Sequence, residues 1–162
     1  LNHTILDEVV KTYTKNNYDY VSNCLPLPRT YPDGINVEVF SKKILDEMYH
    51  NAKKPSEREH VSLYVVMQPK KYKIYRVDYL KDVSHYRFNL DYELDYQLIK
   101  EIFENLYYKN QHFTMEDIIK FLEENPLIFN INSKIKPYEG ILESFEEDSK
   151  KGFQARKNFF MD

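Results

Sequence analysis

The stretch "RTYPDGINVEVF" (residues 29–40) joins a predicted turn to a predicted short strand, and the interpretation of the whole chain starts from it. Its Pro-Asp-Gly sequence (residues 32–34) contains residue types that tight turns favour, and Gly34 is one of only three glycines in 162 residues. Residues 36–40 then alternate polar and apolar side chains, which predicts a half-buried strand. Glu38 lies on the polar face of that strand and faces either solvent or a ligand cleft.

The length and composition are those of one globular domain. The chain has 162 residues and 19.7 kDa, with 42% apolar and 30% charged residues. A net charge of −3 argues against broad binding to nucleic-acid phosphates, which requires a concentrated basic surface. No apolar run approaches the roughly 20 residues that span a bilayer. We therefore expect no nucleic-acid partner and no membrane partner.

The single cysteine and the start of the chain bear on location and completeness. Cys24 is the only cysteine, so no intramolecular disulfide can form. No signal-peptide pattern opens the sequence, and we expect a cytoplasmic protein. The chain begins at Leu1, and its first residues resemble the middle of a domain, so we expect a fragment of a longer protein.

Periodicity and capping residues predict alternating short strands and helices. The expected strands are residues 18–23, 36–40, 72–79 and 85–91. The expected helices begin at the caps Thr4, Ser41, Ser56 and Thr114, carry the stripe from Leu98 to Leu106, and close the chain to about Lys151. The helix that begins at Ser56, with Glu59 as the second member of a capping box, should end by Pro69. The first helix should bury a stripe formed by Ile5, Val9, Val10 and Tyr13. This order predicts an α/β fold in which helices pack over a mostly parallel sheet, with a short β-rich excursion.

Asp91 is the strongest candidate for chemistry. It ends an expected strand and begins an expected helix, and ligands of open α/β sheets bind outside the carboxyl ends of strands. Magnesium accepts one or two carboxylates together with substrate phosphates, and Asp95, one helical turn later, could assist through a bound water. The alternative is structural: Asp91 caps the helix, and Asp95 favours its positive end.

Two further groups could face an anionic substrate. Arg29 could hold a carboxylate or phosphate in a bidentate fork, or simply be solvated. Arg58, Glu59 and His60 could place a cation and an imidazole beside a substrate, or be ordinary polar residues of a helix. The cysteine and histidines lack zinc-site spacing, and no glycine-rich phosphate loop is present.

The segment 70–81, "KKYKIYRVDYLK", interleaves cations with tyrosines. Single-stranded RNA binds to that combination of charge and stacking rings. The alternative is an exposed edge strand whose lysines discourage aggregation.

Several stretches, taken in order, resemble the cytidylyltransferase superfamily. The resemblance is to its spore-coat polysaccharide biosynthesis branch, relatives of the CMP-KDO and CMP-acylneuraminate synthetases. The stretches are "RTYPDGINVEVF" (29–40), "PSEREHVSLYV" (55–65), "FNLDYELDYQLIKEIFENL" (88–106), "FTMEDIIKFLEENPLIFNIN" (113–132) and "KPYEGILESFEED" (136–148). The resemblance implies a doubly wound, Rossmann-like nucleotidyltransferase fold. It also implies a reaction in which a sugar oxygen attacks the α-phosphate of CTP with Mg²⁺ as cofactor, releasing pyrophosphate.

The resemblance also implies roles for particular residues. Asp91 matches the catalytic metal ligand of a "D-T-P-E-D" motif, and Asp95 matches its second Asp, whereas residues 92–94 differ from the motif. Arg29 and Glu38 match a stretch beside the acceptor sugar, in which Asn36 replaces an Asp. The matching "REHV" segment adds Arg58, Glu59 and His60 as substrate-side candidates.

Two nucleotide-binding segments of the superfamily, an L-x-x-R-x-x-x-K loop and a D-x-P segment, are missing from this sequence. The resemblance therefore implies that residues 1–151 form the C-terminal part of a nucleotidyltransferase domain, followed by a frayed tail at 152–162. We expect the acceptor-sugar-binding and dimerisation part of a homodimeric enzyme that uses CTP and an acidic sugar, inactive on its own. The alternative is a non-catalytic interaction module that retains the fold.

Overall fold

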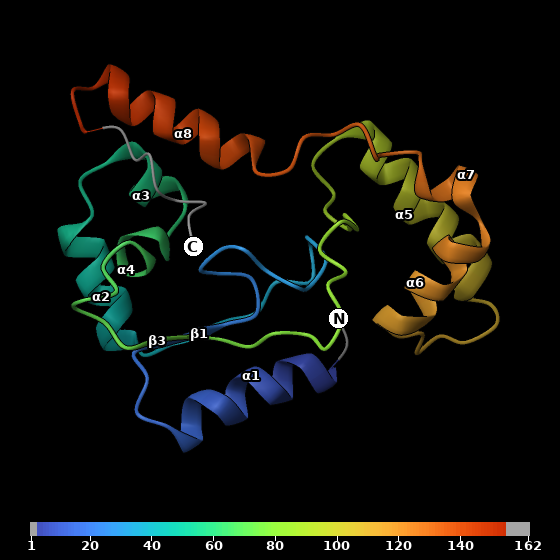
Figure 1. The fold of residues 1–162 in the computed structure, drawn as a ribbon, viewed down its shortest axis with the longest axis horizontal. Coiled ribbons are helices and arrows are strands. Elements are labelled where there is room, and N and C mark those ends of the chain that lie inside the picture. Colours follow the sequence, from blue (N-terminus) through green and yellow to red (C-terminus); the bar gives the residue numbers. More distant parts are fainter. Residues whose placement is uncertain (1–2, 155–162) are drawn as a thin grey trace.

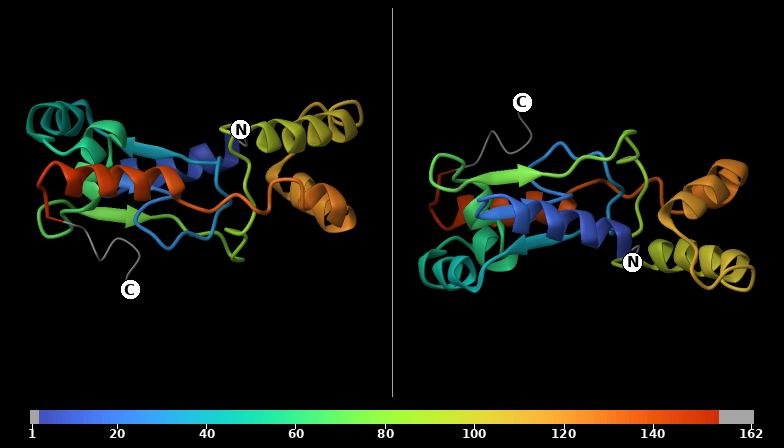
Figure 2. Two further views of the ribbon diagram at one scale, coloured as in Figure 1. Left: turned by 90° about the horizontal axis from the view of Figure 1, so that it is seen from above. Right: turned by 90° about the horizontal axis from the view of Figure 1, so that it is seen from below.

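A computed structural model describes residues 3–154 and places a small sheet between two layers of helices (Figure 1). Helix α1 lies on one side of the sheet and α8 on the other, while α5, α6 and α7 form a lobe at one end (Figure 2). The strands are β1 (Tyr20–Ser22), β2 (Glu38–Phe40) and β3 (Ile74–Arg76). The helices are α1 (His3–Lys15), α2 (Lys42–Asn51), α3 (Pro55–Glu59), α4 (Leu63–Val66), α5 (Glu93–Leu106), α6 (Met115–Glu124), α7 (Pro126–Phe129) and α8 (Glu139–Lys150).

The sheet has the order β2-β1-β3 and is mixed. Strand β1 runs antiparallel to β2, with Val21 opposite Val39, and parallel to β3, with Val21 opposite Tyr75. The expected α/β class is confirmed, but the described sheet is not mostly parallel. The connection from β1 to β2, residues 23–37, contains the Pro-Asp-Gly turn and no helix, and it returns the chain beside β1 in the opposite direction.

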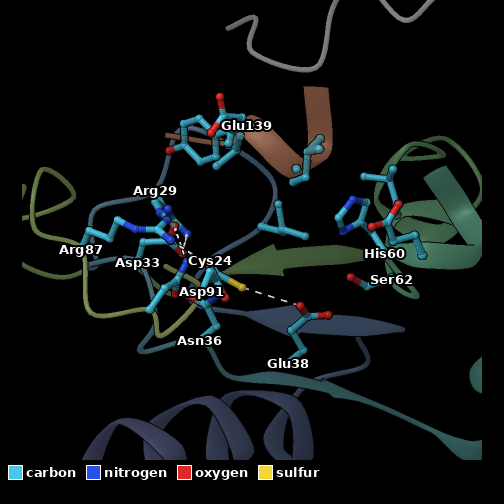
Figure 3. A pocket seen from close by; sticks show the side chains of 18 of the residues that line it. Cys24, Arg29, Asp33, Asn36, Glu38, His60, Ser62, Arg87, Asp91 and Glu139 are labelled. Carbon is cyan, nitrogen blue, oxygen red and sulfur yellow. Dashed lines mark hydrogen bonds and ion pairs between the residues drawn. The ribbon is translucent and has the colours of Figure 1, made fainter. Parts of the chain in front are cut away.

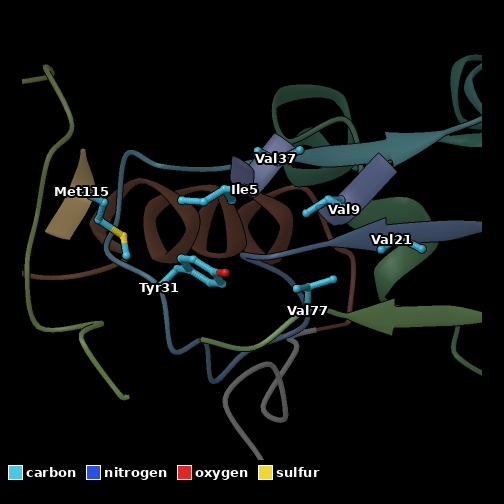
Figure 4. Close-up of a cluster of buried hydrophobic side chains, with 7 residues drawn as sticks. All are labelled: Ile5, Val9, Val21, Tyr31, Val37, Val77 and Met115. Carbon is cyan, nitrogen blue, oxygen red and sulfur yellow. The ribbon is translucent and has the colours of Figure 1, made fainter. Parts of the chain in front are cut away.

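The main hydrophobic core lies between α1 and the sheet (Figure 4). Ile5 and Val9 of α1 are buried against Val21 and Val37, as the helical spacing of the α1 stripe predicts. The remaining buried members are Tyr31, Val77 and Met115. A separate cluster joins α5, α6 and α7 around Leu98, Ile102 and Leu122. The lobe therefore has its own apolar centre.

Residues 85–91, expected as a strand, form a single bridge instead. Asp33 pairs with Arg87 in parallel, and the backbone nitrogen of Phe88 donates to the Asp33 carbonyl at 2.7 Å. Gly34 has a φ of +94°, and a Cβ there would overlap the backbone of Phe88 and Asn89. The partner of this segment is thus a tight turn, and a turn offers too few aligned backbone groups for a ladder.

The expected helix from Ser56 to Pro69 is two short helices, α3 and α4. Helix α3 begins at Pro55, and the carboxylate that caps it is Glu57, which accepts from the backbone nitrogens of Lys53 and Lys54. The predicted capping pair of Ser56 and Glu59 was wrong because Asp148 of α8 takes both donors of Ser56.

Two other caps are confirmed. Ser41 accepts from the backbone nitrogen of Ile44, and Thr114 forms a reciprocal capping box with Asp117. The last helix ends at Lys150, close to the expected Lys151. Of the predicted frayed tail, 155–162 lie outside the described residues.

Candidate functional site

A cleft of about 510 Å³ opens between the end of the sheet and the start of α8 (Figure 3). Its walls come from the loop after β1, the Pro-Asp-Gly turn, β2, the α3–α4 junction, the segment before α5 and the first turn of α8. The predicted site residues that line it are Arg29, Glu38, Glu59, His60 and Asp91. The structure therefore brings together five residues that are spread over 63 positions of the sequence, from 29 to 91.

Arg29 is almost completely buried in the wall of this cleft. Its side chain is 6% exposed, and its Nη1 donates to Asp33 Oδ1 at 2.8 Å. The guanidinium carbon lies 5.0 Å from the centroid of the Tyr138 ring. Within the described part of the chain, the buried Nε of Arg29 has no hydrogen-bond partner. A buried donor without an acceptor costs about 1–3 kcal/mol, so this arginine is short of one acceptor.

Asp33 joins Arg29 to a second arginine. Its Oδ2 lies 3.5 Å from Arg87 Nη1 and accepts from Asn89 Nδ2 at 3.0 Å. Arg87 lines the cleft but was not among the predicted site residues. One sequence signal for it was its place four residues before Asp91, a separation at which opposite charges can form an ion pair.

Arg87 is held mainly by Asp95. Its Nε donates to Asp95 Oδ1 at 3.0 Å, and its Nη2 donates to Asp95 Oδ2 at 2.9 Å and to Asp91 Oδ2 at 2.8 Å. Burial alone would lower the pKa of the Arg87 guanidinium, but the bonds to Asp95 and Asp91 outweigh it and raise that pKa. Arg87 is thus a permanent cation at the cleft wall.

Asp95 is fully buried and outside the cleft lining. It accepts the two Arg87 bonds, a bond from Asn132 Nδ2 at 2.9 Å and bonds from the backbone nitrogens of Asp91 and Tyr92, both at 3.1 Å. Burial would raise the pKa of this carboxyl, but these donors together lower it. Asp95 therefore caps α5, and in this arrangement donors fill both of its oxygens.

Asp91 differs from Asp95 in exposure. Its side chain is 60% exposed, and among the described residues Arg87 is the one partner of its carboxylate. The N-cap position of α5 is Tyr92 and the capping carboxylate is Asp95, so the structural alternative of Asp91 as the cap was wrong. An exposed carboxylate oxygen at the cleft is what a metal or a substrate donor could reach.

Glu59 and His60 meet α8 through Ser144. The Ser144 hydroxyl donates to Glu59 Oε2 at 2.6 Å and lies 3.1 Å from His60 Nε2. A hydroxyl has one hydrogen, so while it donates to Glu59 it can accept from His60. This three-residue contact ties α8 to the α3–α4 junction at the wall of the cleft.

Arg58 is not in the cleft. Its Nη1 donates to the carbonyl of Tyr49 at 3.0 Å, and its guanidinium carbon lies 5.5 Å from the centroid of the Tyr49 ring. These contacts attach α3 to α2. The structure therefore separates Arg58, which faces α2, from Glu59 and His60, which face α8.

Glu38 lines the cleft from β2 beside the single cysteine. The thiol of Cys24 lies 3.7 Å from Glu38 Oε1 and 3.0 Å from Ser22 Oγ. Burial, and then the charge of Glu38, raise the pKa of the Cys24 thiol to about 12. Of the two alternatives for Glu38, the structure places it at a cleft.

The basic segment 70–81 includes an edge strand of the described sheet, β3. Lys71 lies over the Tyr72 ring, 4.6 Å from its centroid, and Tyr75 stacks on Tyr18 at 4.9 Å. Both rings contact the protein itself. This arrangement agrees with the edge-strand alternative.

Residues 3–154 contain no cluster of three or more histidine, cysteine or acidic side chains placed to hold a metal ion. In the same residues, no helix combines the length and apolar character that crossing a membrane requires.

The chain is similar to a protein of known sequence and to a solved structure. No protein family model matches the sequence. An uncharacterized protein of Methanocaldococcus jannaschii is 33% identical over 140 residues, which are 82% of this chain and 52% of that protein. A cytidylyltransferase from Leptospira borgpetersenii serovar Hardjo-bovis has a similar structure, with a TM-score of 0.71 and 28% identity over 84% of this chain and 55% of that one. The chain spans about half the length of both, and its fold is similar to that of a cytidylyltransferase, a class of nucleotidyltransferase.

Proposed function

We propose that this chain is the acceptor-sugar-binding and dimerisation part of a CTP-dependent sugar cytidylyltransferase of surface or spore-coat polysaccharide biosynthesis. It corresponds in this proposal to the C-terminal portion of such an enzyme, and catalysis requires the nucleotide-binding portion as well. Similarity to a cytidylyltransferase structure supports the class. The cleft supports the acceptor-binding role.

The observation that carries the proposal is the buried, partly unpaired guanidinium of Arg29. Asp33 occupies only Nη1, and Nε lacks an acceptor among the described residues. Nε is buried, so a substrate carboxylate would reach it only after the Arg29 side chain shifts toward the cleft that it lines; there it would be a strong acceptor for the remaining guanidinium donors. Arg29 therefore suits the carboxylate of an acidic sugar.

Carboxylates around the cleft suit the hydroxyls of the same sugar. Glu38, Glu59 and Glu139 lie on three different walls. Ionised carboxylates accept hydrogen bonds from hydroxyl groups. A sugar seated on Arg29 would donate to these side chains, which would fix its orientation.

Asp91 fits a single-carboxylate Mg²⁺ site. Its exposed carboxylate faces the cleft, and magnesium is commonly bound by one or two carboxylates and by substrate phosphates. Asp91 would hold the ion, which would supply charge neutralisation at the α-phosphate of CTP. Asp95, the other predicted ligand, acts in this proposal through Arg87 and the start of α5.

The dimerisation part of the proposal is supported by apolar exposure on the α5–α7 lobe. Tyr108 and Leu127 are each 88% exposed there. Exposed apolar side chains at such a protrusion suit contact with a second copy. Sedimentation analysis of the chain tests this, and a monomer at micromolar concentration would contradict it.

Calorimetric titration tests the acceptor role. The 162-residue chain is titrated with acidic sugars such as nonulosonic acids, and with the same sugars reduced to alcohols at the carboxyl. We expect binding of the acids only, weakened about 10- to 100-fold by Arg29→Gln, since bonds to charged groups contribute about 1.5–3 kcal/mol. Arg76→Gln, which changes an arginine outside the cleft, is the matched control.

Equal binding of acids and alcohols would contradict the acidic-sugar proposal. No binding of either would favour the interaction module. Unfolding curves accompany each variant, and Arg29→Lys replaces Arg29→Gln if the latter fails to fold.

A further inference from the structure

We propose that Arg87 is a positioning residue that holds Asp91 in competition with a divalent cation, so that Asp91 exchanges between an internal ion pair and the metal. The inference rests on the proposed function, in which Asp91 is the metal ligand. It goes beyond it by assigning a role to Arg87 and to the buried Asp95.

Arg29, Asp33, Arg87, Asp91 and Asp95 form a charged cluster with one more negative than positive charge. Two guanidiniums, of Arg29 and Arg87, face three carboxylates, of Asp33, Asp91 and Asp95. Charges at this spacing interact strongly when they are shielded from water. The surplus charge favours a cation at whichever carboxylate can leave the cluster.

Asp91 is the carboxylate that can leave. Asp95 is fully buried and accepts five hydrogen bonds, while Asp33 is 16% exposed and is shared by both arginines. Asp91 is 60% exposed and is held by Arg87 alone among residues 3–154. An exposed ion pair of this kind contributes little to stability, so solvent or a cation can displace it.

The fork of Arg87 allows this exchange while the guanidinium stays attached to Asp95. Its Nη2 donates to both Asp91, at 2.8 Å, and Asp95, at 2.9 Å. When the Asp91 side chain turns away, Nη2 keeps its bond to Asp95, and Nε keeps its own bond to the same carboxylate. One N–H of Nη2 loses its protein acceptor and is free to donate to water in the cleft, which Arg87 lines. Asp95 therefore holds Arg87 in place in both states.

Arg87 is also fixed in place. Asn132 donates to Asp95 and to the backbone carbonyl of Arg87, and the Arg87 guanidinium carbon lies 5.6 Å from the Tyr92 ring centroid. An arginine held on several sides cannot follow Asp91 outward. The competition is thus between one fixed cation and one mobile cation for the same carboxylate.

Manganese binding to the 162-residue chain measures this competition. Mn²⁺ alone is the probe, and the free ion is counted by its electron paramagnetic resonance signal. Arg87→Lys keeps the charge beside Asp95 but removes the fork that reaches Asp91. We expect it to raise the Mn²⁺ affinity about fivefold, equivalent to a contact of about 1 kcal/mol in water-like surroundings.

The controls separate charge from geometry. Arg87→Gln with Asp95→Asn removes one cation and one anion together and should raise the affinity as Arg87→Lys does. The matched pair is Arg76→Lys and Arg76→Gln with Asp78→Asn, an arginine forked onto an aspartate outside the cleft, and both should leave Mn²⁺ binding unchanged. The double variant provides the test if Arg87→Lys does not fold.

Asp91→Asn distinguishes failure of the inference from failure of the proposed function. If Asp91→Asn abolishes Mn²⁺ binding and both Arg87 variants bind as wild type or more weakly, the metal assignment stands and the role of Arg87 is overturned. If Asp91→Asn binds Mn²⁺ as wild type, the metal assignment itself fails. Loss with Asp91→Asn and gain with the Arg87 variants supports both.

Discussion

Asp148 of α8 accepts hydrogen bonds from both the backbone nitrogen and the hydroxyl of Ser56 of α3, at 3.0 and 2.6 Å. Both residues are buried, and 92 positions of the chain separate them. The first turn of α8 supplies Tyr138 and Glu139 to the cleft. A contact at the far end of the same helix therefore fixes one wall of the site.

Removing this contact should loosen α8. Asp148→Ala leaves two buried donors of Ser56 without acceptors, and we expect the free energy of unfolding to fall by about 2–3 kcal/mol. Urea unfolding followed by circular dichroism gives the value. Asp46→Ala, on the exposed Lys42–Asp46 pair, should change it by less than about 0.5 kcal/mol. Equal losses in the two variants would show that the Ser56–Asp148 contact contributes no more to stability than an exposed ion pair does.

Gly34 should be intolerant of any side chain. Its φ is +94°, and a Cβ would overlap the backbone of Phe88 and Asn89, so Gly34→Ala should lower the free energy of unfolding by at least about 3 kcal/mol. Gly140 is the matched control because a Cβ there meets no atom within 4 Å. Gly140→Ala, in the first turn of α8, should raise stability by up to about 1 kcal/mol. Thermal unfolding of both variants measures these changes. A Gly34→Ala variant as stable as wild type would contradict the turn geometry.

The chain should lose stability in acid as Asp95 and Asp117 are protonated. Burial opposes ionisation of Asp95, but Arg87 and the other donors lower its pKa, and the bonds from Thr114 lower the pKa of Asp117. Both pKa values are lower in the folded state than the ordinary value of about 3.9. Their contribution is therefore fully present above about pH 4 and is lost as the pH falls through the folded values.

Urea unfolding at pH 6, 4 and 3 measures this dependence. Asp117→Asn should show a smaller loss between pH 4 and pH 3 than wild type, because one titrating group has been removed. Asp7→Asn, on the exposed side of α1, is the control and should follow wild type. A parallel loss in wild type and in Asp117→Asn would exclude Asp117 as a source of the pH dependence.

Local patterns predicted the elements that depend on local interactions. The burial of Ile5 and Val9 on α1 and the caps at Ser41 and Thr114 are each set by residues a few positions apart, and the structure confirms them. Val10, also expected in the buried stripe of α1, is exposed. The expected strand at 85–91 and the expected helix at 56–69 were wrong for the opposite reason. Their partners, Asp33 and Asp148, lie far away in the sequence and cannot be inferred from local spacing.

For the site as well, features set by nearby residues could be predicted and features set by distant contacts could not. Local patterns and the family resemblance indicated five residues that the structure places in one cleft. They did not show that Asp91 lines the cleft while Asp95 is buried outside it, and they did not identify Arg87. That distinction depends on burial, since donors surround Asp95 while Asp91 faces solvent. Arg58 lies outside the cleft because its side chain faces Tyr49 of α2, whereas Glu59 and His60 face Ser144 of α8.

Cys24 should report on the charge of the cleft through its reactivity. The thiolate is the reactive form, and burial together with Glu38 raises the pKa of this thiol to about 12. We expect Ellman's reagent at pH 8 to modify the native chain slowly and the urea-unfolded chain quickly. Glu38→Gln removes a negative charge 3.7 Å from the sulfur and should speed the native reaction by about fivefold, by the Coulomb interaction of two close charges in water. Glu104→Gln, on the exposed face of α5, should react as wild type does. If both variants match wild type, burial alone protects the thiol, and the charge of Glu38 does not reach the part of the cleft where a sugar would bind.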